Sequence, residues 1–175
     1  GQTFARMIGQ AVTDPAISIV DDPTQRTWAG EDLNGHYLYD QEGVPAQRAV
    51  IVEDGIFRGF LMARDPIPGF DKSNGHGRAM VGRAPVARMA NTIVTTSKPR
   101  SEDELRRIFR RELKARGLSY GLLIDDLNGG FTLTGRMMPN TFNIRAVRAF
   151  RIYADGRPDE LVRGVDLVGT PIEAL

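Results

Sequence analysis

A glycine-rich stretch of the sequence, Ser73–Arg78, carries side chains that could bind a ligand. Glycines stand on both sides of His76, and Arg78 follows the second of them. Glycine lets the backbone approach a ligand closely, and an imidazole near a guanidinium could hold a peptide carbonyl or a carboxylate. The alternative is a flexible loop that links two strands, which is the common role of glycine-rich runs. The stretch therefore predicts either a binding loop or a plain connection.

A second pair of candidate binding side chains, Arg88 and Asn91, lies three residues apart where an extended run begins. From the edge of a strand, both could form hydrogen bonds with the backbone of a substrate, whatever its side chains are. Alternatively, Arg88 pairs with a local carboxylate and Asn91 occupies a turn. The first alternative suits a cleft that binds an extended peptide.

Two groups of acidic residues could support such a site. Asp40 and Glu42 are expected to lie in a tight turn, where their carboxylates could orient the neighbouring loop. Asp21 and Asp22 have the spacing of paired carboxylates for acid and base chemistry. They also end a predicted strand just before a proline, where an aspartate side chain favours the start of a turn.

The composition fits a folded, intracellular protein. At 175 residues, with 41% hydrophobic and 26% charged residues, the chain predicts one globular domain. A net charge of +1 excludes a general polyanion binder, which would carry a basic field. The absence of cysteine is compatible with a reducing compartment. Because no apolar run is long enough to span a membrane and the first residues show no basic region followed by an apolar stretch, the sequence predicts a cytoplasmic protein without a membrane partner.

Helix signals are concentrated near the middle of the chain. Ser101 and Glu104 form a capping pattern in which the serine hydroxyl accepts a hydrogen bond from the amide three residues on. Apolar residues then recur at helical spacing, acidic residues precede basic ones, and Gly117 ends the pattern. The sequence predicts an amphipathic helix over residues 101–117 and a shorter helix over residues 3–12.

Hairpin signals account for much of the remaining sequence. Asp54-Gly55 suits a type I′ turn, which needs two residues that tolerate positive φ. Asn128–Gly130 and Asp155-Gly156 are two further candidate turns. The three turns would join 48–53 to 56–62, 122–125 to 131–134, and 147–153 to 161–167. Short strands joined in this way predict an α+β fold built mainly on antiparallel sheet.

Four spaced patterns in the first half of the chain are similar to those of one protein family. They are Tyr39-Asp40-x-Glu42-Gly43-x-Pro45-Ala46-Gln47, Glu53-Asp54-Gly55, Asn74-Gly75-x-Gly77-Arg78 and Pro85-x-x-Arg88-Met89-x-Asn91. Together they resemble the TldD/PmbA family, known as candidate modulators of DNA gyrase and as zinc-dependent peptidases. The resemblance extends from Gly1 through Ile19–Pro23 to Arg163–Thr170.

The resemblance implies a peptidase that acts on unfolded or extended peptides, but it does not place the metal in this chain. The family's zinc site uses a His-Glu-x-x-x-His helix and a cysteine, and neither occurs here. His36 and His76 are forty positions apart and cannot bind one ion from a single helix face. By the family pattern, the zinc helix is expected just before Gly1 and the cysteine just after Leu175. The chain is thus expected to be an excised segment of a larger protein, inactive alone and without a metal.

Within that segment, the resemblance implies a substrate cleft formed by His76, Arg78, Arg88 and Asn91. Family members assemble as homodimers or as heterodimers with a related subunit, and one type of subunit lacks the zinc motif. The alternative function is therefore a non-catalytic partner subunit or a peptide-binding module.

Five arginines between residues 106 and 116 raise the question of nucleic-acid binding. Acidic residues are interspersed among them, as is typical of a solvated helix stabilised by pairs at i and i+4. The sequence therefore predicts no nucleic-acid partner.

Overall fold

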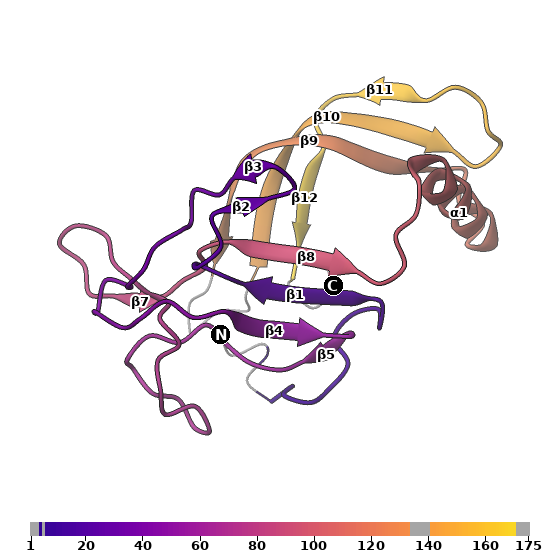
Figure 1. The fold of residues 1–175 in the computed structure, drawn as a ribbon. Coiled ribbons are helices and arrows are strands. Elements are labelled where there is room, and N and C mark those ends of the chain that lie inside the picture. Colours follow the sequence, from indigo (N-terminus) through magenta and orange to yellow (C-terminus); the bar gives the residue numbers. More distant parts are fainter. Residues whose placement is uncertain (1–3, 5, 134–140, 171–175) are drawn as a thin grey trace. The chain divides into compact units, whose positions relative to one another are not determined.

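Antiparallel strands make up most of the regular secondary structure among the described residues, in agreement with the predicted α+β class (Figure 1). The computed structural model describes residue 4 and residues 6–133 and 141–170. These residues group into two compact units, of which one covers residues 6–98 and the other covers residue 4 and the described residues from Pro99 onward. We call them the 6–98 unit and the C-terminal unit.

The 6–98 unit is built on a four-stranded antiparallel sheet with the strand order β5-β4-β1-β8. Strand β1 lies in the middle, and its last residue, Asp21, pairs with Ala49 on one side and Thr92 on the other. The strands are β1 (Ile17–Asp21), β4 (Ala49–Glu53), β5 (Ile56–Phe57) and β8 (Thr92–Thr96). Two short ribbons complete the unit: β2 (Thr27–Trp28) with β3 (Glu31–Asp32), and β6 (Gly77–Arg78) with β7 (Val86–Ala87).

The predicted hairpin at residues 54 and 55 is confirmed. Strands β4 and β5 pair Glu53 with Ile56 and Val52 with Phe57. The two turn residues have φ values of 50° and 78°, as a type I′ turn requires. Val52 and Phe57 are both buried, so the hairpin contributes directly to the core.

The structure does not show the predicted helix over residues 3–12. Residues 3 and 5 lie outside the described residues, and residues 6–12 form turns and a single bridge between Ala11 and Ile56. The amides of Gly9 and Val12 donate to carbonyls of Phe57 and Gly55, at 2.8 Å in each case. These long-range hydrogen bonds replace the local ones that a helix would need.

The C-terminal unit contains a sheet in which β10 (Thr141–Tyr153) pairs with three other strands. Its partners are β9 (Tyr120–Leu133), β11 (Glu160–Val162) and β12 (Asp166–Gly169). The β10–β11 pairing places residues 155 and 156 in the connection between these strands, as predicted. Within the described residues, β9 and β10 remain paired from Tyr120 opposite Tyr153 to Leu133 opposite Thr141.

The predicted hairpin turn at Asn128–Gly130 is wrong. These residues lie inside β9, where the register against β10 is irregular between Leu127 and Gly130. Gly129 and Gly130 have φ values of 65° and 146°, which accommodate an irregularity as readily as a turn. A Cβ at Gly130 would overlap the carbonyl oxygen of Asn143 on β10. The glycine is therefore required by the close approach of the neighbouring strand.

The predicted helix is confirmed as α1 (Glu102–Ala115). The Ser101 hydroxyl accepts from the Glu104 amide at 3.2 Å. At the other end, Gly117 has a φ of 67°, its amide donates to Lys114, and the Leu118 amide donates to Leu113. This double hydrogen bond is the Schellman arrangement, which ends a helix with a left-handed glycine. No helix among the described residues is long and apolar enough to cross a bilayer.

Two arginines of α1 are paired with carboxylates. Arg106 contacts Glu102 one turn away at 3.0 Å and Asp159 at 2.5 Å, and Arg110 lies 3.7 Å from Asp159. Such contacts match the interspersed charge pattern expected of a solvated helix.

Replacing Ser101 by alanine should lower the unfolding free energy of the C-terminal unit by about 1 kcal/mol, because one end of α1 loses its cap. Aspartate at the same position retains an acceptor and adds a favourable charge near the helix N-terminus. Urea unfolding followed by circular dichroism should therefore rank the wild type and Ser101→Asp above Ser101→Ala. Equal stability of all three proteins would show that the cap contributes nothing.

Candidate functional site

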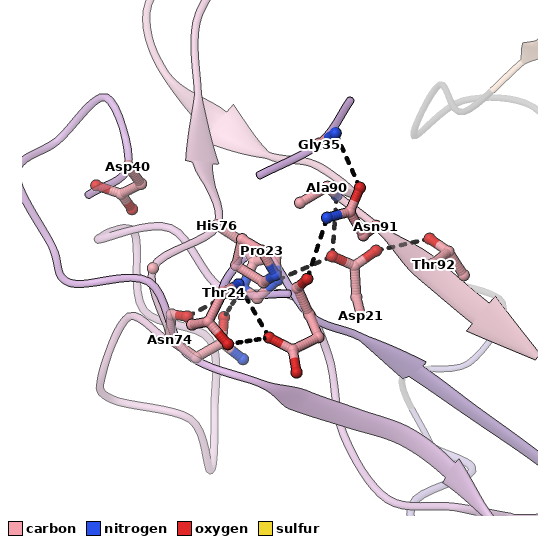
Figure 2. Close-up of polar contacts among 12 residues, drawn as sticks. Asp21, Pro23, Thr24, Gly35, Asp40, Asn74, His76, Ala90, Asn91 and Thr92 are labelled. Carbon is pink, nitrogen blue, oxygen red and sulfur yellow. Dashed lines mark hydrogen bonds and ion pairs between the residues drawn. The ribbon is translucent and has the colours of Figure 1, made fainter. Parts of the chain in front are cut away.

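His76 lies at the centre of a buried polar network in the 6–98 unit. It belongs to the loop Ser73–Gly77, which we call the histidine loop, and its side chain is 0% exposed. Its Nε2 lies 3.1 Å from Asp21 Oδ1 at the end of β1. Its Nδ1 lies 2.9 Å from Asn74 Oδ1 within the same loop. Figure 2 shows the imidazole between these two partners.

The orientation of the Asn74 amide is fixed by backbone contacts. Its Nδ2 donates to the Phe60 carbonyl at 2.9 Å, and its Oδ1 accepts from the Met62 amide at 2.7 Å. The atom that faces His76 is therefore an oxygen acceptor. Since Asp21 also presents an oxygen, both ring nitrogens of His76 face oxygen atoms of the protein.

Asp21 joins the histidine loop to the start of β8. Besides His76, its carboxylate accepts from the Ala90 amide at 2.9 Å and from the Thr92 hydroxyl at 2.6 Å (Figure 2). Burial alone would raise the pKa of Asp21, but the hydrogen bonds from His76, Thr92 and Ala90 outweigh it and lower the pKa. The group is therefore held as a carboxylate.

Asn91 fastens a separate set of loops beside this network. Its Oδ1 accepts from the Gly35 amide at 2.8 Å (Figure 2). Its Nδ2 donates to the carbonyls of Gln25 at 3.0 Å and Asp22 at 3.3 Å. The side chain is buried. A Cβ at Gly35 would overlap the Ala90 carbonyl oxygen, so glycine is needed for this close packing.

Asp40 and Glu42 are both bonded to the chain around the histidine loop. Asp40 accepts from the amides of Glu42 and Val44, each at 2.9 Å, and from the Gly77 amide at 2.8 Å. Glu42 accepts from the Arg64 amide at 2.8 Å and contacts the Arg64 side chain at 3.3 Å. Any Cβ at Gly77 would overlap the Glu42 carboxylate. That the two acids orient the histidine loop stays a prediction.

Arg78 and Arg88 line an open cleft of about 340 Å³. We call it the arginine cleft, and its lining residues are Gln41, Arg78, Ala79, Met80, Arg88 and Met89. The Arg78 guanidinium lies 4.8 Å from the centre of the Tyr37 ring, and the Tyr37 hydroxyl donates to the Gly75 carbonyl at 2.8 Å. Burial raises the pKa of Tyr37 although Arg78 opposes the rise, so the phenol stays a neutral donor.

The structure thus divides the four predicted binding residues into two pairs. Arg78 and Arg88 face the arginine cleft, whereas His76 and Asn91 are buried and satisfied by hydrogen bonds within the protein. Substrate contact stays a prediction for Arg78 and Arg88. For His76 and Asn91, the buried position supports a role in holding the loops.

Sequence reasoning assigned Asp21 to a turn and missed its partnership with His76. The turn is formed by its neighbour Asp22, which accepts from the Thr24 amide at 2.9 Å. A polar residue at the end of a central, apolar strand was the available signal for Asp21, because such a position is rarely solvated. Asn74 was likewise noted only as part of a glycine-rich pattern.

Among the described residues, no three side chains of histidine, aspartate or glutamate converge as a metal site would require. His36 Nδ1 lies 2.9 Å from the Pro23 carbonyl, and both nitrogens of His76 are engaged by oxygens of the protein. The donor sets around the two histidines therefore do not fit a zinc ion.

Comparison with known proteins relates the whole chain to one family. Residues 1–175 match the family described as the PmbA/TldA metallopeptidase C-terminal domain. A metalloprotease of Methanothermobacter thermautotrophicus is 31% identical over 96% of this chain, and a metalloprotease TldD homolog of Haemophilus influenzae is 26% identical over 98%. The matches cover 33% and 32% of these relatives, so the chain spans about a third of their length.

Solved structures show the same fold. TldE from Thermococcus kodakarensis matches with a TM-score of 0.61 at 20% identity, over 97% of this chain and 35% of the other. A candidate modulator of a DNA gyrase from Thermotoga maritima matches with a TM-score of 0.59, also at 20% identity and with the same coverage of both chains.

Proposed function

Because the chain belongs to the PmbA/TldD metallopeptidase family, in which it matches the C-terminal domain, we propose that it forms the substrate cleft of a zinc-dependent peptidase. The full-length protein would act on unfolded or extended peptides. The match over residues 1–175 is the observation that carries the proposal. In this chain, the arginine cleft is the place where we expect the peptide to lie.

The ribbon that borders the arginine cleft supports an extended substrate. Strand β7 pairs with β6 and, among the described strands, with no other, so its outer edge has backbone groups available. Extended peptides commonly bind by adding a strand to such an edge. Arg78 and Arg88 would contact the peptide, while His76, Asn91, Asp40 and Glu42 hold the loops that present the two arginines.

We place the zinc ligands of the full-length protein outside residues 1–175, since neither histidine environment described above suits the ion. The isolated segment is accordingly expected to be inactive. As in the family pattern, the intact protein would form a homodimer or a heterodimer with a related subunit in the cytoplasm.

A non-catalytic partner subunit is the second candidate function. Its support is the similarity to TldE, whose fold matches this chain over 97% of its length. This candidate uses the same cleft to hold a peptide that another subunit cleaves.

The full-length protein, purified with bound metal, should contain zinc and cleave an unstructured peptide. Removal of the metal by a chelator should abolish cleavage, and added zinc should restore it. Metal analysis and mass spectrometry of the peptide fragments provide the measurements. A protein that binds the peptide but contains no zinc and cleaves nothing would support the partner-subunit candidate, and loss of both binding and cleavage would refute the proposal.

A further inference from the structure

The register of the β6–β7 ribbon places Arg78 and Arg88 on one face. Arg78 pairs with Val86, and the Arg88 amide donates to the His76 carbonyl at 3.0 Å, so residues 76 and 88 are also opposite each other. Directly opposed residues share a face, as do residues two apart in a strand. The two arginines are therefore diagonal neighbours on the ribbon. Diagonal neighbours in an antiparallel pair are about 7–8 Å apart, within reach of long side chains.

Within the part of the chain that the structure describes, neither arginine has a carboxylate partner. The remaining lining of the arginine cleft is neutral, with one glutamine, one alanine and two methionines. The acidic residues near the histidine loop already have other partners. Asp40 accepts hydrogen bonds from backbone amides, and Glu42 forms an ion pair with Arg64. Two like charges on one ribbon face repel each other unless an anion lies between them.

The Arg78 side chain is also held in place. Its guanidinium lies over the Tyr37 ring, and Tyr37 is in turn fixed by its hydrogen bond to the Gly75 carbonyl. A cation over an aromatic ring retains free N–H donors at its rim. Less conformational freedom is then lost when Arg78 binds a ligand.

We propose that the arginine cleft selects a carboxylate of the bound peptide, supplied by an aspartate or glutamate side chain or by the peptide's C-terminus. This inference rests on the proposed function and specifies its substrate class. Guanidinium groups bind carboxylates through paired, charge-assisted hydrogen bonds. Met80 and Met89 are each 67% exposed, and their flexible thioethers suit varied apolar side chains beside the acidic residue. A peptide therefore fits the cleft better than a small inorganic anion.

Binding of matched fluorescent peptides to the full-length, metal-depleted protein tests the proposal without cleavage. One peptide carries a single internal glutamate and its pair carries glutamine, and each is made with a free and with an amidated C-terminus. Fluorescence anisotropy should show about 10-fold or stronger binding of a carboxylate-bearing peptide than of its neutral match, as charge-assisted hydrogen bonds give. The glutamate pair and the C-terminal pair report which carboxylate is selected.

Arg78→Gln and Arg88→Gln should each remove most of this preference. Arg83→Gln is the matched control, because Arg83 lies in the loop that connects β6 to β7 but does not line the cleft. Peptides that bind without any preference for a carboxylate, or a preference that survives in both cleft variants, would overturn the inference while leaving the proposed function intact. Failure of every peptide to bind would overturn both.

Discussion

Replacing Asp21 by alanine should lower the unfolding free energy of the 6–98 unit by about 2–4 kcal/mol, because buried polar groups lose the carboxylate that accepts their hydrogen bonds. The carboxylate is 1% exposed and accepts hydrogen bonds from His76, Ala90 and Thr92. Its removal takes the oxygen partner away from His76 Nε2 and from the Ala90 amide. Urea unfolding, followed by the fluorescence of the single tryptophan in this unit, measures the change.

Two companion variants separate charge from hydrogen bonding. Asparagine at position 21 keeps an oxygen for His76 and the Ala90 amide, and its amide nitrogen can donate to Thr92, whose hydroxyl accepts as well as donates. Asp21→Asn should therefore cost clearly less than Asp21→Ala. Asp65→Ala removes an exposed aspartate from the same unit and should change stability by less than about 0.5 kcal/mol. If Asp21→Ala were as mild as the surface variant, the buried network would contribute little.

The same carboxylate makes the unit sensitive to acid. Because the pKa of Asp21 is lowered by folding, the unfolded chain binds its proton at a higher pH than the folded chain. The stabilisation is complete above the unfolded pKa of about 3.9 and is lost as the pH falls through that value toward the lower folded pKa. Asp21→Asn should lack this part of the pH dependence. Unfolding curves between about pH 3 and pH 6 would show parallel profiles if Asp21 did not contribute.

The parts of the fold that were predicted correctly depend on local chemistry. A serine cap and a terminal glycine define α1 within its own sequence, because the bonds they form reach only a few residues away. The turn at Asp54-Gly55 is similarly local, since two positive φ values set both the turn type and the pairing of Val52 with Phe57.

The predictions were wrong where one local sequence pattern is compatible with two different structures. Gly129 and Gly130 could form a turn or an irregularity within a strand, and the choice depends on residues 141–153, which supply the neighbouring strand. The apolar spacing over residues 3–12 is compatible with a helix. Hydrogen bonds to Gly55 and Phe57 decide otherwise, and they connect positions that are more than forty residues apart.

The sequence singled out the candidate residues but did not separate the buried ones from those that line a cleft. Glycine spacing drew attention to the histidine loop and to Arg78, which follows it. Burial of His76 depends on Asp21, 55 positions away, so no local pattern could distinguish a ligand-facing imidazole from a buried one. Only the pairing of β6 with β7 in the folded unit shows that Arg78 and Arg88 share a cleft.

Replacing Gly75 by alanine should destabilise the 6–98 unit by about 2–5 kcal/mol, the sum of left-handed strain and overpacking. Gly75 has a φ of 74°, and a Cβ there would overlap the Pro45 carbonyl oxygen, a backbone atom that cannot rotate away. The displaced backbone would also move the Gly75 carbonyl that holds Tyr37 under Arg78. Urea unfolding measures the stability, and the anisotropy assay described above measures the cleft.

Gly43 provides the matched control, because it has nearly the same backbone conformation without the crowding. Its φ is 77°, and a Cβ built there meets nothing within 4 Å. Gly43→Ala therefore isolates the left-handed strain, about 1–2 kcal/mol, and leaves the difference between the two variants as the steric contribution of Pro45. An equal loss of unfolding free energy in the two variants would mean that the histidine loop accommodates the added methyl group without a steric penalty. A larger loss in Gly75→Ala, together with weaker peptide binding, would show that the packing beneath the loop determines the position of Arg78.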